Sequence, residues 1–163
     1  LDDIMDLSRQ GRSREPEKPM DISTLAQDVA EDYADTGAPV TVGDMPKAVA
    51  ACRPVLFRRA LRNLIDNAIA GTPDGGRIVI EIRKAPEGAN LGMEISIADN
   101  GRGMTSRELA LAQGGVQTGK GGTPERRTGL GIPLARQLIE AHDGTLEIAS
   151  RRGAGTTATI RLP

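Results

Sequence analysis

Apolar residues recur at helical spacing in three stretches of this chain, and each stretch predicts an amphipathic helix. The first helix is expected from Asp21, where Asp21 or Ser23 can act as the N-cap, to about Gly37. The second is expected from residue 54 to 71, with Pro54 suited to its first turn. Its apolar stripe consists of Phe57, Leu61, Leu64, Ile65 and Ala68. The third is expected over residues 130–141 and is stopped near Gly144.

Between these helices, short apolar runs and alternating apolar and polar residues predict strands. Two short strands are expected at residues 40–42 and 48–51. Two antiparallel hairpins are expected, one from residues 77–83 and 93–97 and the other from residues 145–149 and 156–162. The glycine-rich stretch before residue 130 is expected to be poor in helix. Strands that come mostly in hairpins, with helices between the pairs, predict an α+β two-layer sandwich rather than a doubly wound parallel sheet.

The N-terminal twenty residues differ from the rest of the chain. Residues 1–10 have the spacing of a helical stub, which we interpret as the end of an element that starts upstream. Residues 11–20 are charged, rich in Pro and Gly and without periodicity, as is typical of a linker. We therefore expect a single domain over residues 21–163, within a longer protein.

Composition and charge argue against several classes of protein. With one cysteine and one histidine among 163 residues, neither an internal disulfide nor a zinc cluster is expected. The net charge of -1 and the presence of only two aromatic residues, Tyr33 and Phe57, argue against a nucleic-acid partner. No apolar run approaches the roughly 18 residues that a membrane span needs. We expect a soluble domain in a reducing compartment.

Nine of the twenty glycines fall between Gly101 and Gly131, and this clustering is the strongest functional signal in the sequence. Glycine lets the backbone approach a ligand closely, and a following helix offers free N–H groups to phosphate. The segment 114–120, GGVQTGK, nearly matches a phosphate loop, but Gly121 stands where Ser or Thr would bind Mg²⁺. It fits a lid that closes over a nucleotide better. TGLGI, residues 128–132, precedes the third predicted helix and is placed to present N–H groups to phosphates.

Polar side chains at two further places suit a nucleotide. Asn63 and Asn67 lie four residues apart on one helix face, where each costs roughly 0.5–0.7 kcal/mol of helix propensity relative to Ala. They suggest an Mg²⁺ ligand, although solvated polar residues are the alternative. Asp99 ends a predicted strand and opens DNGRGM, where its carboxylate can accept a hydrogen bond from the exocyclic amine of adenine. The alternative for Asp99 is a turn-forming residue.

Taken in order, NLIDNA (63–68), DNGRGM (99–104), TGLGI (128–132) and GAGTT (153–157) resemble the N, G1, G2 and final glycine boxes of sensor histidine kinases. The resemblance covers roughly residues 20–163 and implies their catalytic, ATP-binding domain. The implied fold is the Bergerat fold, a two-layer sandwich in which about three helices cover one face of a mixed, mostly antiparallel sheet. Gyrase, Hsp90 and MutL ATPases share it.

The resemblance implies roles for individual residues. Asn67 resembles the family's Mg²⁺ ligand, and Asn63 resembles its polar partner near the phosphates. Asp99 would hold the adenine amine, with Thr156 as its support. The other residues implied to bind ATP are Gly101, Gly103, Met104, Lys120, Thr128, Gly129, Leu130 and Gly131.

Departures from the family pattern leave alternatives open. Many kinases carry a basic and then an aromatic residue where this chain has Ala70 and Gly71, and the phenylalanine-containing box before the lid is missing. A degenerate kinase domain that acts as a binding module is one alternative. A related ATPase or an anti-sigma-factor serine kinase is the other.

The resemblance also implies partners that lie outside this chain. These are the family's own dimerisation domain with its phosphoacceptor histidine, a response-regulator receiver domain, and a second copy in a full-length homodimer. The domain itself is expected in the cytoplasm, in a full-length protein that is either free or anchored in the inner membrane.

Overall fold

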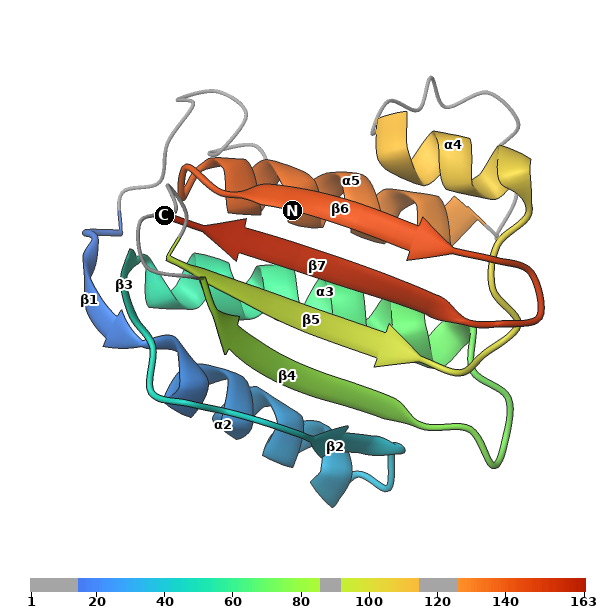
Figure 1. Ribbon diagram of the computed structural model, residues 1–163, viewed down its shortest axis with the longest axis horizontal. Helices are drawn as coiled ribbons and strands as arrows, with labels where there is room; N and C mark the ends of the chain where they lie inside the picture. Colours follow the sequence, from blue (N-terminus) through green and yellow to red (C-terminus); the bar gives the residue numbers. More distant parts are fainter. Residues whose placement is uncertain (1–14, 86–91, 115–125) are drawn as a thin grey trace.

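The computed structural model describes residues 15–85, 92–114 and 126–163, with the side chains of α5 described from Gly131 onward. A five-stranded sheet of order β2-β4-β5-β7-β6 forms one layer (Figure 1). Its strands are β2 (Val40–Val42), β4 (Ile78–Lys84), β5 (Met93–Asp99), β6 (Thr145–Ser150) and β7 (Thr156–Leu162). β2 runs parallel to β4, whereas the other neighbours are antiparallel. The predicted α+β sandwich with a mixed, mostly antiparallel sheet is confirmed.

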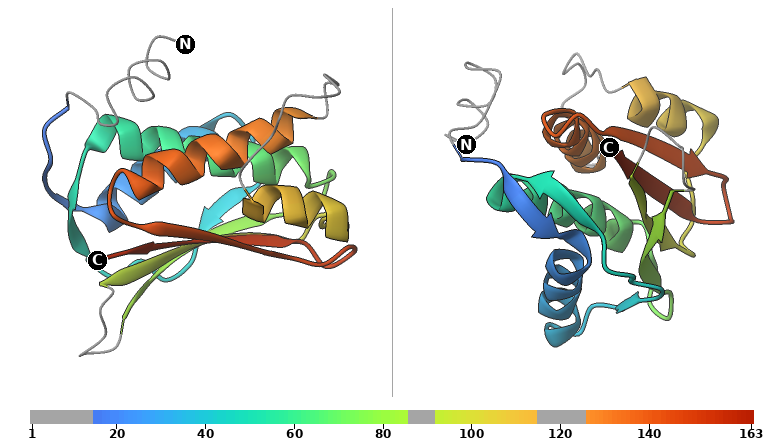
Figure 2. Two further views of the ribbon diagram at one scale, coloured as in Figure 1. Left: turned by 90° about the horizontal axis from the view of Figure 1, so that it is seen from above. Right: turned by 60° about the vertical axis from the view of Figure 1, so that its left-hand side comes forward.

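The helices form the second layer, on one side of the sheet (Figure 2). They are α2 (Ile22–Asp35), α3 (Pro54–Ala70) and α5 (Arg126–Glu140), with α4 (Ser106–Gly114) beside the edge strand β6. α2 begins where expected because the Asp21 carboxylate accepts a hydrogen bond from Ser23 N at 3.2 Å. Phe57 of α3 is completely buried between the layers. None of the helices that the structure describes is both long and apolar enough to cross a membrane.

Residues 15–20 correct the prediction of a linker over residues 11–20. β1 (Lys18–Asp21) pairs antiparallel with β3 (Val49–Cys52), which begins one residue later than expected. The Glu15 carboxylate accepts hydrogen bonds from Val55 N at 2.9 Å and Leu56 N at 3.2 Å, which caps the N-terminus of α3. The composition of residues 11–20 does not indicate these contacts, because each of them joins residues about 40 positions apart in the sequence. The predicted helical stub lies outside the described residues.

α4 corrects the prediction that the stretch before residue 130 is poor in helix. Thr105 Oγ1 accepts a hydrogen bond from Glu108 N at 3.1 Å, and Glu108 Oε1 accepts one from Thr105 N at 2.9 Å. This reciprocal capping box starts the helix despite the glycines around it. At the other end of α4, the Gln113 side chain binds the backbone of Ile148 on β6, and Arg136 of α5 donates to the carbonyl oxygens of Leu146 and Ala112.

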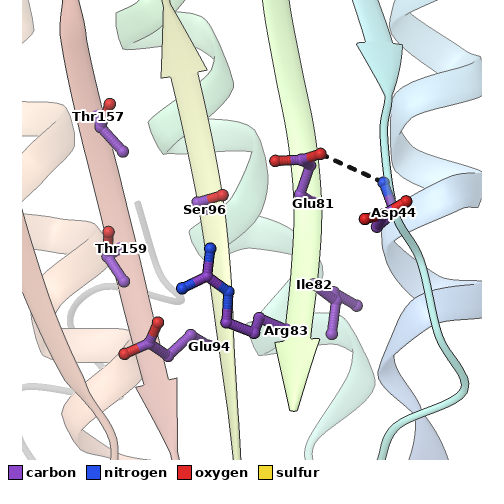
Figure 3. A pocket seen from close by; sticks show the side chains of 8 residues that line it. All are labelled: Asp44, Glu81, Ile82, Arg83, Glu94, Ser96, Thr157 and Thr159. Atoms are coloured by element: carbon purple, nitrogen blue, oxygen red, sulfur yellow. Dashed lines mark hydrogen bonds between the residues drawn. The ribbon is translucent and has the colours of Figure 1, made fainter. Parts of the chain in front are cut away.

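No helix among the described residues lies on the opposite face of the sheet (Figure 2). This face carries polar side chains, among them Glu94, Ser96 and Thr159. Arg161 forms ion pairs with Glu94 and Glu147, each at 2.8 Å. A hollow of about 360 Å³ lies on this face, and Figure 3 shows the side chains that line it. Its lining residues are Asp44, Glu81, Ile82, Arg83, Glu94, Ser96, Thr157 and Thr159. The hollow contains none of the residues predicted to bind a nucleotide.

Candidate functional site

Strand alternation decides which way Asp99 points. On β5 the side chains of Met93, Ile95 and Ile97 are buried against the helices, so Asp99, two residues further on, lies on the same face. Asp99 pairs in register with Thr156, the first residue of β7. The carboxylate therefore lies at the end of the sheet, on the side that the helices cover.

The Asp99 carboxylate is held in one orientation by backbone donors. Its Oδ1 accepts hydrogen bonds from Gly101 N at 2.8 Å and from Thr156 N at 3.2 Å. Burial raises the pKa of this carboxyl, and the two hydrogen bonds offset part of that shift. Oδ2 has no hydrogen-bond partner in the part of the chain that the structure describes, so one acceptor oxygen remains for a ligand.

Glycines allow the loop after Asp99 to pass close to its neighbours. A Cβ on Gly101 would overlap the carbonyl oxygen of Gly71, and a Cβ on Gly103, whose φ is +74°, would overlap that of Arg151. The loop is thus held between the turn that follows α3 and the turn that follows β6. A side chain at either glycine would push the loop out of this position.

Asn63 and Asn67 project from one face of α3, one helical turn apart, and both are half-buried. The Nδ2 of Asn63 and the Oδ1 of Asn67 are buried without a hydrogen-bond partner among the described residues. A native protein leaves few buried polar atoms unpaired. The pair therefore offers one unused donor and one unused acceptor oxygen.

Backbone hydrogen bonds bring the asparagine pair and Asp99 to the same end of the sandwich. Gly71 N donates to the carbonyl oxygen of Asn67 at 3.2 Å, and the carbonyl oxygen of Gly71 accepts from Arg102 N at 3.1 Å. Arg102 lies in the loop that begins after Asp99. The last turn of α3 and the Asp99 loop are consequently joined directly.

The start of α5 corrects the prediction for the TGLGI segment. The helix begins at Arg126, four residues before the expected Leu130, so residues 128–132 lie within a helix rather than in a turn ahead of it. Gly131 lies beside α3, where a Cβ would be 3.5 Å from the carbonyl oxygen of Asn63. Lys120 lies outside the described residues.

Sequence reasoning missed Ser150, the last residue of β6. Its Oγ accepts a hydrogen bond from Met104 N at 2.8 Å and lies 2.7 Å from Thr156 Oγ1. The hairpin of β6 and β7 pairs Ser150 with Thr156, and alternation along β6 places it on the helix side, next to the buried Ile148. The predicted hairpin of residues 145–149 and 156–162, extended by one residue, would have placed Ser150 opposite Thr156 and so indicated it from the sequence.

The donor set at this site suits Mg²⁺ bound together with phosphate oxygens. No group of three or more His, Cys, Asp or Glu residues that would hold a metal occurs within the described ranges. Asn67 Oδ1 is nevertheless an unpaired oxygen ligand of the kind that Mg²⁺ takes. Mg²⁺ is commonly held by only one or two protein ligands plus the phosphates of a substrate, so the residues present fit this ion.

The known proteins that this chain resembles are histidine kinases and related ATPases. Residues 52–163 match the family of histidine kinase-, DNA gyrase B- and HSP90-like ATPases. The chain is 39% identical to histidine protein kinase DivJ of Caulobacter vibrioides over 111 residues, or 65% of this chain and 18% of that protein. It is 36% identical to sporulation kinase E of Bacillus subtilis over 69% of this chain and 14% of that protein. The chain thus spans less than a fifth of the length of these two relatives.

A solved structure resembles the fold closely. The ATP-binding domain of PrrB from Mycobacterium tuberculosis aligns with a TM-score of 0.68 and 25% identity, covering 90% of this chain and 96% of that domain. The likeness extends over almost the whole of that domain.

Proposed function

This chain belongs to the family of histidine kinase-, DNA gyrase B- and HSP90-like ATPases, and on that premise we propose that it binds ATP with Mg²⁺ and positions the γ-phosphate for transfer to a histidine. It is an ATP-binding domain of the histidine kinase type. The acceptor histidine would belong to a dimerisation domain outside this chain. The observation that supports the proposal most is the Asp99 carboxylate, fixed through one oxygen and open at the other.

Asp99 would recognise the base. An ionised carboxylate only accepts hydrogen bonds, and the exocyclic amine of adenine only donates them. Because Oδ1 is engaged by Gly101 N and Thr156 N, Oδ2 is the oxygen that would receive the amine. Gly101 and Gly103 would give the base room by keeping the loop against its neighbours.

The asparagine pair would bind the other end of the nucleotide. Asn67 Oδ1 would ligate Mg²⁺, and Asn63 Nδ2 would donate to a phosphate oxygen, so both unpaired atoms would be satisfied. Bound Mg²⁺ supplies neutralisation of the charge on the phosphates. Phosphoryl transfer passes through a loose transition state, so alignment of ATP is the main task of these residues.

Asn63 also argues against the alternative of an ATP-hydrolysing enzyme. Such an enzyme needs a group that takes a proton from the attacking water, and an amide cannot do so at neutral pH. No carboxylate replaces it on that face of α3, since the neighbouring acid Asp66 is exposed and accepts a hydrogen bond from the Tyr33 hydroxyl at 2.7 Å. Transfer to an imidazole from another domain fits this site better than hydrolysis.

The proposed partners follow from that mechanism. The chain would dock on the dimerisation domain that carries the acceptor histidine, and the phosphorylated histidine would then serve a receiver domain of a response regulator. Full-length protein would be a homodimer through the dimerisation domain. Mixing this chain with that domain and ATP, and following phosphohistidine formation, tests this part directly.

Asp99→Asn tests the base pocket. Asparagine still offers an oxygen to Gly101 N and Thr156 N, but it then presents an NH₂ group to the adenine amine. We expect calorimetry to show an ATP affinity at least about tenfold lower, the size of one charge-assisted hydrogen bond. Urea unfolding should show equal or higher stability, because burial already disfavours the charged form of Asp99.

Asp143→Asn provides the matched control for charge. Asp143 is exposed in the turn that follows α5, and its φ of 61° is one that asparagine tolerates well. This variant should bind ATP like the unsubstituted protein. Undiminished ATP binding by the Asp99→Asn variant would overturn the proposed pocket.

A further inference from the structure

Three side chains form a row across the end of the sheet, all on the side that the helices cover. They are Asp99 on β5, Thr156 on β7 and Ser150 on β6, and the strand registers place them opposite one another. Asp99 and Thr156 already belong to the proposed nucleotide site. Ser150 is the third member, and the proposed function gives it no role.

The hydrogen bonds of Ser150 determine where its proton lies. Its Oγ is 3.0 Å from the carbonyl oxygen of Gly155, and a carbonyl oxygen can only accept. All three contacts of Ser150 Oγ are hydrogen bonds in one arrangement, in which its single hydroxyl proton is donated to Gly155. The two lone pairs of Oγ are left to accept, and one of them accepts from Met104 N at 2.8 Å.

This assignment fixes the direction of the Thr156 hydroxyl as well. Thr156 Oγ1 and Ser150 Oγ are 2.7 Å apart, and one of them must donate to the other. Because Ser150 has no proton left, Thr156 donates. The oxygen of Thr156 then has only lone pairs to offer to any other group.

The edge that this row presents to a base therefore only accepts hydrogen bonds. Asp99 contributes Oδ2, and Thr156 contributes the remaining lone pairs of Oγ1. Where such an edge faces position 6 of a purine, it favours an amino group at that position. It disfavours a purine with a carbonyl oxygen there, because acceptor would face acceptor.

We propose that Ser150 is a positioning residue that selects 6-aminopurine over 6-oxopurine nucleotides by directing the Thr156 hydroxyl proton away from the base. The inference rests on the proposed function, since it concerns the same pocket. Ser150 also holds the backbone of Met104, so it fixes the loop and the hydroxyl through one oxygen atom.

The test compares the dissociation constants of ATP and inosine triphosphate, which carries a carbonyl oxygen in place of the amine. In Ser150→Ala the Thr156 hydroxyl is free to turn and donate to that oxygen. We expect the preference for ATP over inosine triphosphate to fall about three- to tenfold, the worth of one neutral hydrogen bond. Ser150→Thr keeps a hydroxyl and should retain the preference.

Two further measurements separate this role from general loosening of the fold. Ser96→Ala removes a hydroxyl from the uncovered face of the same sheet (Figure 3) and should leave the preference unchanged. Hydrogen exchange at the Met104 amide should become faster in Ser150→Ala even without nucleotide.

The outcomes are distinguishable. An unchanged nucleotide preference in Ser150→Ala, while the unsubstituted protein binds ATP, overturns this inference and leaves the proposed function standing. Failure of the unsubstituted protein to bind ATP overturns both. A lost preference that Ser150→Thr restores supports the inference.

Discussion

At the scale of single residues, Asn67 is the position where function and stability are expected to oppose each other. Its buried Oδ1 has no partner among the described residues, and asparagine costs roughly 0.5–0.7 kcal/mol in a helix relative to alanine. Asn67→Ala should therefore leave the free energy of unfolding of the ligand-free protein unchanged or slightly higher. The same change should remove most of the gain in ATP affinity that Mg²⁺ provides, as measured by calorimetry with Mg²⁺ and with EDTA.

Asn67→Asp is the companion variant, because it retains an oxygen ligand. It should keep the dependence on Mg²⁺, whereas Asn67→Ala should bind ATP about equally with the metal and with EDTA. If Asn67→Ala keeps the full Mg²⁺ dependence, Asn67 is not the metal ligand.

Residue-level predictions succeeded in placing side chains where a single element decides their direction. The spacing of Asn63 and Asn67 within one helix puts them on one face, and Asp99 ends its strand, β5, as expected. Ser150 was missed because its contacts depend on how two strands and a distant loop meet. The roles of these residues toward ATP stay predictions, which the experiments above address.

At the scale of elements, the turn between β6 and β7 offers a matched pair of glycines. Gly153 and Gly155 both have positive φ, +83° and +87°. A Cβ at Gly153 would meet no atom within 4 Å, whereas one at Gly155 would overlap the carbonyl oxygen of Asp99. Gly153→Ala should cost about 1–2 kcal/mol of unfolding free energy through backbone strain alone.

Gly155→Ala should cost roughly 1–3 kcal/mol more, because the overlap adds to the same strain. Urea denaturation of the two variants measures the difference. Equal losses would mean that the backbone does not approach Asp99 as closely as described. Gly155→Ala should also weaken ATP binding, whereas Gly153→Ala should not.

Helices and strands with a clear periodic pattern of apolar residues were predicted well. Elements that depend on capping contacts or on a strand partner distant in the sequence were not predicted. The apolar stripe of α3 gave its limits correctly, and the two hairpins lie in the expected strands. β1 exists because β3 pairs with it, so its charged, proline-containing sequence gives no sign of it. α4 depends on the capping box of Thr105 and Glu108, a pair of contacts that the glycine-rich composition of this stretch does not reveal.

At the scale of the whole molecule, a ligand that binds only the folded state should raise the melting temperature. With Mg²⁺-ATP at a hundred times its dissociation constant, the folded state gains about 2.7 kcal/mol. For a chain of this length the shift is roughly 5–11 °C, measurable by calorimetric or fluorescence melting. An unchanged melting temperature at millimolar Mg²⁺-ATP would favour the alternative of a degenerate kinase domain that acts as a binding module. GTP is the control nucleotide for this measurement.

The edge strand β6 has a consequence for how copies of this chain behave at high concentration. An open strand edge is a template on which another chain can add a strand. Here the carbonyl oxygen of Leu146 and both backbone groups of Ile148 are already occupied by Arg136 and Gln113. Loss of these two side chains would expose that edge and favour aggregation through intermolecular β-pairing, without any change in the apolar core.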